Sequence, residues 1–411
     1  MLETEVNTGW ILISAMLVFF MQAGFAMLEV GSVRSKNAQN ILLKNVLDVC
    51  VSGLCWILLG FGFAFGESAG NFIGGSKFGT VMTKDDYTNC FFQWAFASTA
   101  ATIVSGSLAE RTQFSAYVIY SIFITCFVYP VVVHWTWGGG WLTQLGFQDF
   151  AGSCIVHTVG GVAGLVGASV IGPRDGKFTA ERENEFKPHN VPSVILGMFI
   201  LWFGWYGFNA GSTVSLVEGN HIVASKICVN TTMAAIASGI VSFLFKKRVH
   251  GYTNPIYDLN ALTNGILAGL VSITAPCSNV EVYSSLIIGA IGGIVYVLSS
   301  HLLNKMHVDD PLEAFPVHGA CGIWGTFALG LFDESVGVFY GNNGEQLGHQ
   351  CIGIVAITAW TSILCFVLFN SLKRCDKLRV DRVVEEMGMD AYYHGGEAYN
   401  IKDGEPASTS I

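Results

Sequence analysis

Charged residues are scarce in this sequence. Asp, Glu, Lys and Arg make up 12% of its 411 residues and hydrophobic residues make up 52%, whereas a soluble protein usually carries about 25% charged residues. The net charge is −9 and no basic run occurs, which argues against nucleic acid as a partner. The composition therefore places the chain in a lipid bilayer.

Motifs of several other protein classes are also missing. No glycine-rich phosphate loop of the P-loop pattern is present, and no nucleophile is paired with a base, so we expect neither an enzyme nor a cofactor. A metal site at Cys154 and His157 is not expected, because no second ligand pair has metal spacing. The eleven cysteines lie mostly inside apolar runs and imply no disulfide framework. Cys90 and Cys277 fall at the ends of two runs, and their pairing is left open.

Long apolar runs dominate the sequence. Eleven are long enough to cross a hydrocarbon layer about 30 Å thick. They cover residues 8–30, 39–65, 90–109, 115–133, 150–171, 191–212, 220–245, 257–275, 283–303, 311–332 and 347–372. The first lacks the basic region and cleavage site of a signal peptide, so we expect it to be retained. We predict an all-α polytopic membrane protein with eleven transmembrane helices in a membrane domain over 1–372, followed by a C-terminal tail over 373–411.

Lysine and arginine placement predicts the orientation of these helices. Most basic residues fall on one side: Arg34, Lys36, Lys44, Arg111, Arg174, Lys177, Arg182, Lys187, Lys246, Lys247, Arg248, Lys305 and those of the tail. Only Lys77, Lys84 and Lys226 fall on the other side. By the positive-inside rule the N-terminus is outside and the tail is cytoplasmic.

A spacing of eight residues between an aspartate and a histidine occurs twice, each time at the start of an apolar run. Asp149 precedes His157, and Asp310 precedes His318. Measured from each aspartate, the histidine lies about 12 Å along its helix, close to the bilayer midplane. Ionisable groups at that depth are costly and usually functional.

The repeated aspartate and histidine spacing is interpreted together with the odd number of predicted spans. Runs one to five and six to ten then cross in opposite senses, so we predict two inverted five-helix repeats, about 8–172 and 191–333, with the helix at 347–372 added. The two histidines approach the midplane from opposite faces and can meet there.

Each of these residues also has a structural interpretation. Asp149 fits a helix cap, since Asp is a preferred N-cap and its charge suits the helix dipole. A single buried histidine is as readily explained by a hydrogen bond to a carbonyl as by transport, and the paired spacing favours function. Pro316, two positions before His318, predicts a distorted tenth helix, which transporters use beside substrate sites.

Aromatic and hydroxyl residues gather on the predicted outer side: Phe92, Phe96, Trp137, Phe208 and Ser212. Aromatic faces attract cations and a hydroxyl accepts a hydrogen bond, so together they suit ammonium. An aromatic belt at the membrane interface explains them equally well.

Seven motifs make the chain resemble the Amt/Mep/Rh ammonium transporter family over nearly its whole length. They are Met21-Gln-Ala-Gly-Phe-Ala-Met-Leu-Glu29, Leu108-Ala-Glu-Arg111, Trp137-Gly-Gly-Gly140, Asp149-Phe-Ala-Gly152, Pro188-His-Asn-Val-Pro192, Trp205-Tyr-Gly-Phe-Asn-Ala-Gly-Ser212 and Phe315-Pro-Val-His-Gly-Ala-Cys-Gly322. Trp137 favours the Amt branch, because Rh proteins generally lack it. The first span and the tail motifs Gly388-Met-Asp390 and His394-Gly-Gly396 are most similar to plant-type Amt members. Those members carry a phosphorylatable Thr where this chain has Tyr392, so that regulation is not expected.

The resemblance implies a multi-pass homotrimer of the plasma membrane with one pore per subunit. It implies three sets of site residues: a recruitment site at Phe96, Trp137 and Ser212, a gate at Phe96 and Phe208, and a pore with a proton relay at His157 and His318. Asp149 would support the recruitment site. No cofactor is implied.

The expected function is ammonium transport. Burying an unpaired cation costs on the order of tens of kcal/mol in the idealised limit, so we expect ammonium to be captured outside, deprotonated near the gate and conducted as ammonia. The proton would pass separately along the histidines, which burial keeps mostly neutral, giving electrogenic net uptake. Methylammonium is expected to pass where it fits. Two alternatives are an electroneutral ammonia or carbon dioxide channel of the Rh kind and an ammonium sensor that signals through its tail.

Overall fold

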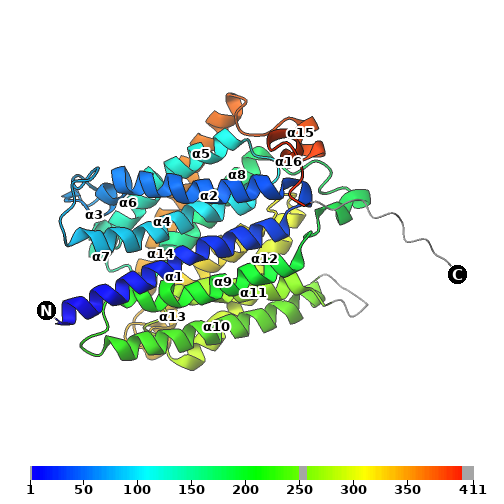
Figure 1. Cartoon of the computed structure of the whole chain (residues 1–411). Coiled ribbons are helices and arrows are strands. Elements are labelled where there is room, and N and C mark those ends of the chain that lie inside the picture. Colours follow the sequence, from blue (N-terminus) through cyan, green and yellow to red (C-terminus); the bar gives the residue numbers. More distant parts are fainter. Residues whose placement is uncertain (1, 250–256, 400–411) are drawn as a thin grey trace.

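The computed structural model describes residues 2–249 and 257–399 as a bundle of long helices (Figure 1). The end of the predicted tail, residues 400–411, lies outside the described residues.

Helices occupy all eleven predicted runs. They are α1 (Leu2–Ser32), α2 and α3 (Ala38–Cys55 and Phe61–Phe65, joined by a π-helical turn at Trp56–Gly60), α4 (Asp86–Leu108), α5 and α6 (Phe114–Phe123 and Tyr129–Trp135, joined by a π-helical turn at Ile124–Val128), α8 (Val159–Ile171, preceded by the π-helix Ser153–Thr158), α9 (Val191–Asn209, followed by the 3-10 turn Ala210–Thr213), α10 (Asn220–Val249), α11 (Leu259–Thr274), α12 (Val282–Lys305), α13 (Cys321–Phe332, preceded by the π-helix Phe315–Ala320) and α14 (Glu345–Arg374). Within the described residues, nine of these segments are long and apolar enough to cross a membrane, a group that leaves out α4 and the shorter α11.

The remaining elements are short and lie in connections. They are the antiparallel strands β1 (Ser68–Ala69) and β2 (Ile73–Gly74), α7 (Trp141–Leu145), the 3-10 turns Ser35–Asn37, Ala180–Phe186 and Val338–Tyr340, and the tail helices α15 (Arg382–Met387) and α16 (Met389–Tyr393).

Two groups of helices lie side by side in Figure 1, α2 to α8 above and α9 to α13 below, with α1 between them. Helix α1 packs along α9 with the two backbones close together. A Cβ added at Gly24 would lie 3.1 Å from the Gly197 carbonyl oxygen, and one added at Gly197 would lie 2.7 Å from that of Gly24. Small residues of this kind let apolar helices approach closely in a membrane.

The two histidine-bearing helices begin later than the sequence analysis predicts. Regular helical hydrogen bonding begins at Ser153 and Phe315 instead of directly after Asp149 and Asp310. The estimate of about 12 Å along a helix from each aspartate is therefore wrong, because bends and turns occupy the first part of that path. The predicted distortion near Pro316 is confirmed as a π-helix, and Ser153–Thr158 carries a second one without any proline.

The tail folds back onto the ends of the helices at which the predicted cytoplasmic loops lie (Figure 1). Its Asp390 carboxylate accepts hydrogen bonds from the backbone amides of Gln39 and Asn40, at 2.8 and 2.9 Å, in the first turn of α2. The Met389 amide donates to the Asn37 side-chain oxygen at 3.0 Å. The tail therefore caps a helix that lies near the start of the chain.

A buried cluster of charges joins the loops at the same end. The Arg174 guanidinium contacts the carboxylates of Asp309 at 2.8 Å and Glu110 at 2.6 Å, and Arg34 also pairs with Glu110. Burial by itself raises the pKa of both carboxyls, but the positive charge of Arg174 outweighs it and holds both pKa values below the ordinary range. These paired carboxylates connect α4, the loop after α8 and the loop after α12.

Replacing Arg174 with glutamine should destabilise the protein by about 3–5 kcal/mol, because it leaves the buried Asp309 carboxylate without its paired cation and Glu110 with Arg34 alone. Thermal unfolding of the purified protein in detergent measures this. Arg182→Gln is the matched control, since its ion pairs are partly exposed and such pairs contribute about 0–1 kcal/mol. Equal losses in the two variants would contradict the prediction.

The same cluster has a defined pH dependence. Its carboxyls have lowered pKa values in the folded state, so their stabilisation is present above the unfolded value of about 4 and is lost as the pH falls below it. The difference in stability between the wild type and Arg174→Gln should therefore shrink below about pH 4.

Candidate functional site

The two predicted histidines meet. Nδ1 of His157 lies 3.2 Å from Nδ1 of His318, and the ring centroids are 5.2 Å apart with an angle of 19° between the planes. A hydrogen bond at this distance needs a proton on one Nδ1 and a lone pair on the other. Both rings are buried, so the proton between the two Nδ1 atoms is shared out of contact with bulk water.

Close approach of two backbones brings the rings together. A Cβ added at Gly161 would lie 2.2 Å from the amide nitrogen of Gly319, directly after His318. A Cβ added at Gly322 would lie 2.4 Å from the Ser153 carbonyl oxygen. A larger residue at either position would push the two helices apart. Because these helices carry the histidines, it would also move the two rings.

Aromatic rings surround the pair. His157 stacks on Trp205, with centroids 5.0 Å apart and an angle of 11°, and its centroid lies 5.3 Å from that of Phe208. The Trp205 indole N–H donates to the Thr274 hydroxyl at 3.0 Å, which fixes the ring. No role for Trp205 is predicted from the sequence. Its position three residues before Phe208 indicates that the two side chains share a helix face, because residues at that spacing are neighbours on a helix.

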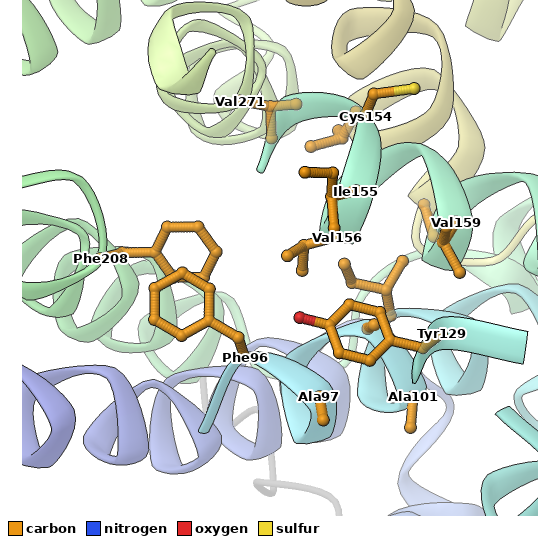
Figure 2. Packing of buried hydrophobic residues seen from close by; sticks show 14 of the residues in the cluster. Phe96, Ala97, Ala101, Tyr129, Cys154, Ile155, Val156, Val159, Phe208 and Val271 are labelled. Atoms are coloured by element: carbon orange, nitrogen blue, oxygen red, sulfur yellow. The ribbon is translucent and has the colours of Figure 1, made fainter. Parts of the chain in front are cut away.

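The two predicted gate residues are in contact. The Phe96 and Phe208 rings stack with centroids 4.1 Å apart, and Figure 2 shows them face to face beside Val156 of the histidine-bearing helix. Both are buried, at 1% and 0% exposure. The ring of Trp137 lies edge-on to Phe96 at 5.9 Å. The two rings therefore lie between Trp137 and His157 in a continuous series of ring contacts.

Asp149 is bound by the backbone of its own loop. Its carboxylate oxygens accept four amide N–H groups, those of Gly152, Ser153, Cys154 and Ile155, at 2.7 to 3.1 Å. Its carbonyl oxygen accepts the Trp137 indole N–H at 2.9 Å. Asp149 thus caps the helix that carries His157 and orients Trp137 at the same time.

Ser212 lies one helical turn beyond Phe208. Its hydroxyl donates to the Phe208 carbonyl oxygen at 2.8 Å. Within the described part of the chain, that hydrogen bond is directed back into its own turn and not towards Trp137 or Asp149. A hydroxyl oxygen that donates in this way keeps lone pairs for a cation.

Two hollows lie beyond the ends of this series of side chains. One of about 400 Å³ is lined by Trp137, Gly139, Asp149 and Phe150, among others. The other, of about 170 Å³, is lined by Asp309, Asp310 and other residues at the end where the tail lies. We call the second hollow the vestibule.

Metal and disulfide chemistry find no support in the described residues. They contain no group of three or more His, Cys, Asp and Glu side chains that could hold a metal ion. All eleven cysteines are free thiols, and Cys90 and Cys277 are each buried without a disulfide partner.

Comparisons with known proteins agree on one family. The model of the Ammonium Transporter Family matches residues 9–399. A putative ammonium transporter of Synechocystis is 44% identical over 95% of this chain and 88% of that relative, and ammonium transporter 1 member 1 of Arabidopsis thaliana is 41% identical over 94% and 83%.

Solved structures give the same result. A protein described as a sensor Amt protein has a TM-score of 0.89 and 36% identity, covering 95% of this chain and 99% of that one. Mep2 of Candida albicans has a TM-score of 0.84 and 28% identity, covering 99% and 93%.

The chain therefore belongs to the ammonium transporter family, and it is a multi-pass helical membrane protein. The resemblance that the sequence motifs indicate, including the likeness to plant ammonium transporters, is confirmed.

Replacing Gly161 with alanine should reduce ammonium uptake by about 100-fold, because a misplacement of about 1 Å at a reactive site has an effect of that order. The added Cβ pushes the Gly319 backbone away and separates the two histidine rings. Uptake into proteoliposomes measures the loss. Gly348→Ala in α14 is the control, since nothing lies within 4 Å of the added atom. Wild-type uptake in Gly161→Ala would contradict the role of this contact.

Proposed function

We propose that this protein captures ammonium at Trp137, Phe96 and Ser212, removes its proton near the gate of Phe96 and Phe208, and conducts ammonia past His157 and His318. The observation that carries the proposal is the order of these contacts. Trp137 touches Phe96, Phe96 stacks on Phe208, Phe208 lies against His157, and His157 is hydrogen-bonded to His318.

Capture at Trp137 and Ser212 has a physical basis. The indole face attracts a cation, and the Ser212 oxygen can accept a hydrogen bond from one N–H group of ammonium. The Asp149 carboxylate is saturated by four amides, so it acts as a fixed negative charge and a support for Trp137 and does not take the proton directly.

Proton loss follows from what lies beyond the gate. The path there is lined by buried aromatic rings, and a bare cation in such surroundings loses its hydration without an equivalent replacement. Ammonia does not carry that cost. Potassium has no proton to release, so the same step excludes it.

The histidine pair suits a separate route for the proton. Each Nδ1 is engaged by the other ring, which leaves Nε2 of each ring for exchange with its own side of the pair. A proton taken up at Nε2 of one ring allows the shared proton to shift and another to leave from the far Nε2. The net result is electrogenic uptake of ammonium.

We also propose the assembly in which this occurs. The spans number eleven, with the N-terminus outside, the tail in the cytoplasm and two inverted repeats, and three subunits form a homotrimer in the plasma membrane. Tail docking beside the buried basic residues Arg34 and Arg174 supports the orientation, since such residues favour the cytoplasmic side. The π-helix that contains each histidine supports the repeats.

A sensing role is the second candidate. One similar structure is described as a sensor Amt protein, and the tail of this chain contacts the start of α2 and the loop after α8. A tail in that position would transmit a change in the membrane domain.

Current and internal pH recorded together in proteoliposomes test the transport mechanism. An ammonium jump should produce a saturable inward current, and a potassium jump should not. Alkalinisation without current would instead favour the electroneutral channel. Silence in a verified folded assembly would favour the sensor.

Replacing His157 or His318 with alanine should impair the separation of ammonia and proton, because each removal interrupts the Nδ1 contact. We expect altered selectivity between ammonium and potassium in the same recordings. Unchanged ammonium current together with unchanged potassium exclusion in both variants would rule out the relay.

A further inference from the structure

A small cavity lies against His318. Its volume is about 20 Å³, which is room for about one water-sized molecule. Besides His318, the lining includes Phe25, Glu29, Asn264 and Leu312. Among the described residues that line it, Glu29 is the only acid, so Glu29 and one member of the histidine pair border the same small space.

Glu29 accepts hydrogen bonds from two neutral donors. It is 1% exposed on α1, and its oxygens accept the Asn45 side-chain N–H at 3.1 Å and the Ser105 hydroxyl. Charge-assisted hydrogen bonds of this kind stabilise an ionised acid. Each oxygen retains a lone pair, so the group can still take a proton.

Two other carboxylates of the protein lie in ion pairs. Asp309 is bound by Arg174, and Glu313 lies 3.8 Å from the Lys246 ammonium. No ion pair within 4.0 Å is formed by Glu29 in the described part of the chain, although Lys44 acts on it over a longer distance. An acid inside the membrane without a bound cation is costly, and such acids usually have a function.

The position of His318 directs a proton into the same cavity. Nδ1 of His318 is occupied by His157, so Nε2 is the nitrogen left for exchange, and the ring lines the cavity. Glu29 lines the same cavity as His318.

We propose that Glu29 accepts the proton that leaves the histidine pair, an inference that rests on the proposed proton relay. The N–H bond at His318 Nε2 breaks and an O–H bond forms on Glu29, directly or through one water in the cavity. The imidazole becomes neutral, and the carboxylate becomes a carboxylic acid.

Release towards the cytoplasm completes the cycle. Asn264 and Leu312 line both this cavity and the vestibule. The O–H bond of Glu29 then breaks as vestibule water takes the proton, and the hydrogen bonds from Asn45 and Ser105 restore the carboxylate. Ammonia, which carries no charge, needs no such acceptor.

Glu29→Gln tests this assignment, because glutamine keeps the shape and hydrogen-bonding capacity but does not take up a proton. We expect the ammonium current in proteoliposomes to fall by about 100-fold, the lower range for loss of a positioned acid or base. Alkalinisation of the interior by ammonia should persist. Glu29→Asp should recover part of the current.

Asp48→Asn is the matched control. Asp48 on α2 is also buried. Its carboxylate accepts hydrogen bonds from the hydroxyls of Thr102, at 2.7 Å, and Ser121, and it does not line the cavity. The current of this variant should remain within about twofold of the wild type. A loss equal to that in Glu29→Gln would overturn the assignment, because any buried acid would then have the same effect.

The remaining outcomes separate this inference from the proposed function. A wild-type current retained in Glu29→Gln overturns the role of Glu29 and leaves the relay intact. If both current and alkalinisation are lost in Glu29→Gln and Glu29→Asp, Glu29 is needed for folding, and the inference is also overturned. Alkalinisation without current in the wild type overturns the electrogenic relay itself.

Discussion

The contact between two helix backbones at Gly161 and Gly319 sets the geometry on which the rest of the structure depends. Each helix begins at an aspartate-capped loop and carries a histidine in its first turns. The glycine contact limits how close the two helices come, and the histidine rings meet in a hydrogen bond at that separation. The aromatic rings then pack around a pair whose separation is already determined by the backbone.

The surroundings differ on the two sides of the stacked phenylalanines. At Trp137 an aromatic face and the Asp149 carboxylate lie beside a large hollow, and such groups favour a cation. Beyond Phe208 lie further rings and the histidine pair. In the proposed mechanism the charged substrate is stabilised on the first side and its neutral form on the second.

Much of this was predictable from the sequence. The apolar runs and the repeated aspartate and histidine spacing indicated the helices and the histidine pair, and the likeness to a known family pointed to the two phenylalanines that stack in the structure. Helix starts were misjudged because a capping aspartate does not distinguish a helix that begins at once from one that begins after a folded loop. The π-helix at Ser153–Thr158 has no proline to mark it, and Glu29 lies 289 positions from His318 in a sequence that gives no sign of their shared cavity.

The cap of α2 comes from the opposite end of the chain. Asp390 lies 350 positions after Asn40, whose amide it accepts. Synthesis proceeds from the N-terminus, so α2 is made long before the residue that completes its first turn. The cap of this helix can therefore form only after more than three hundred further residues have been made.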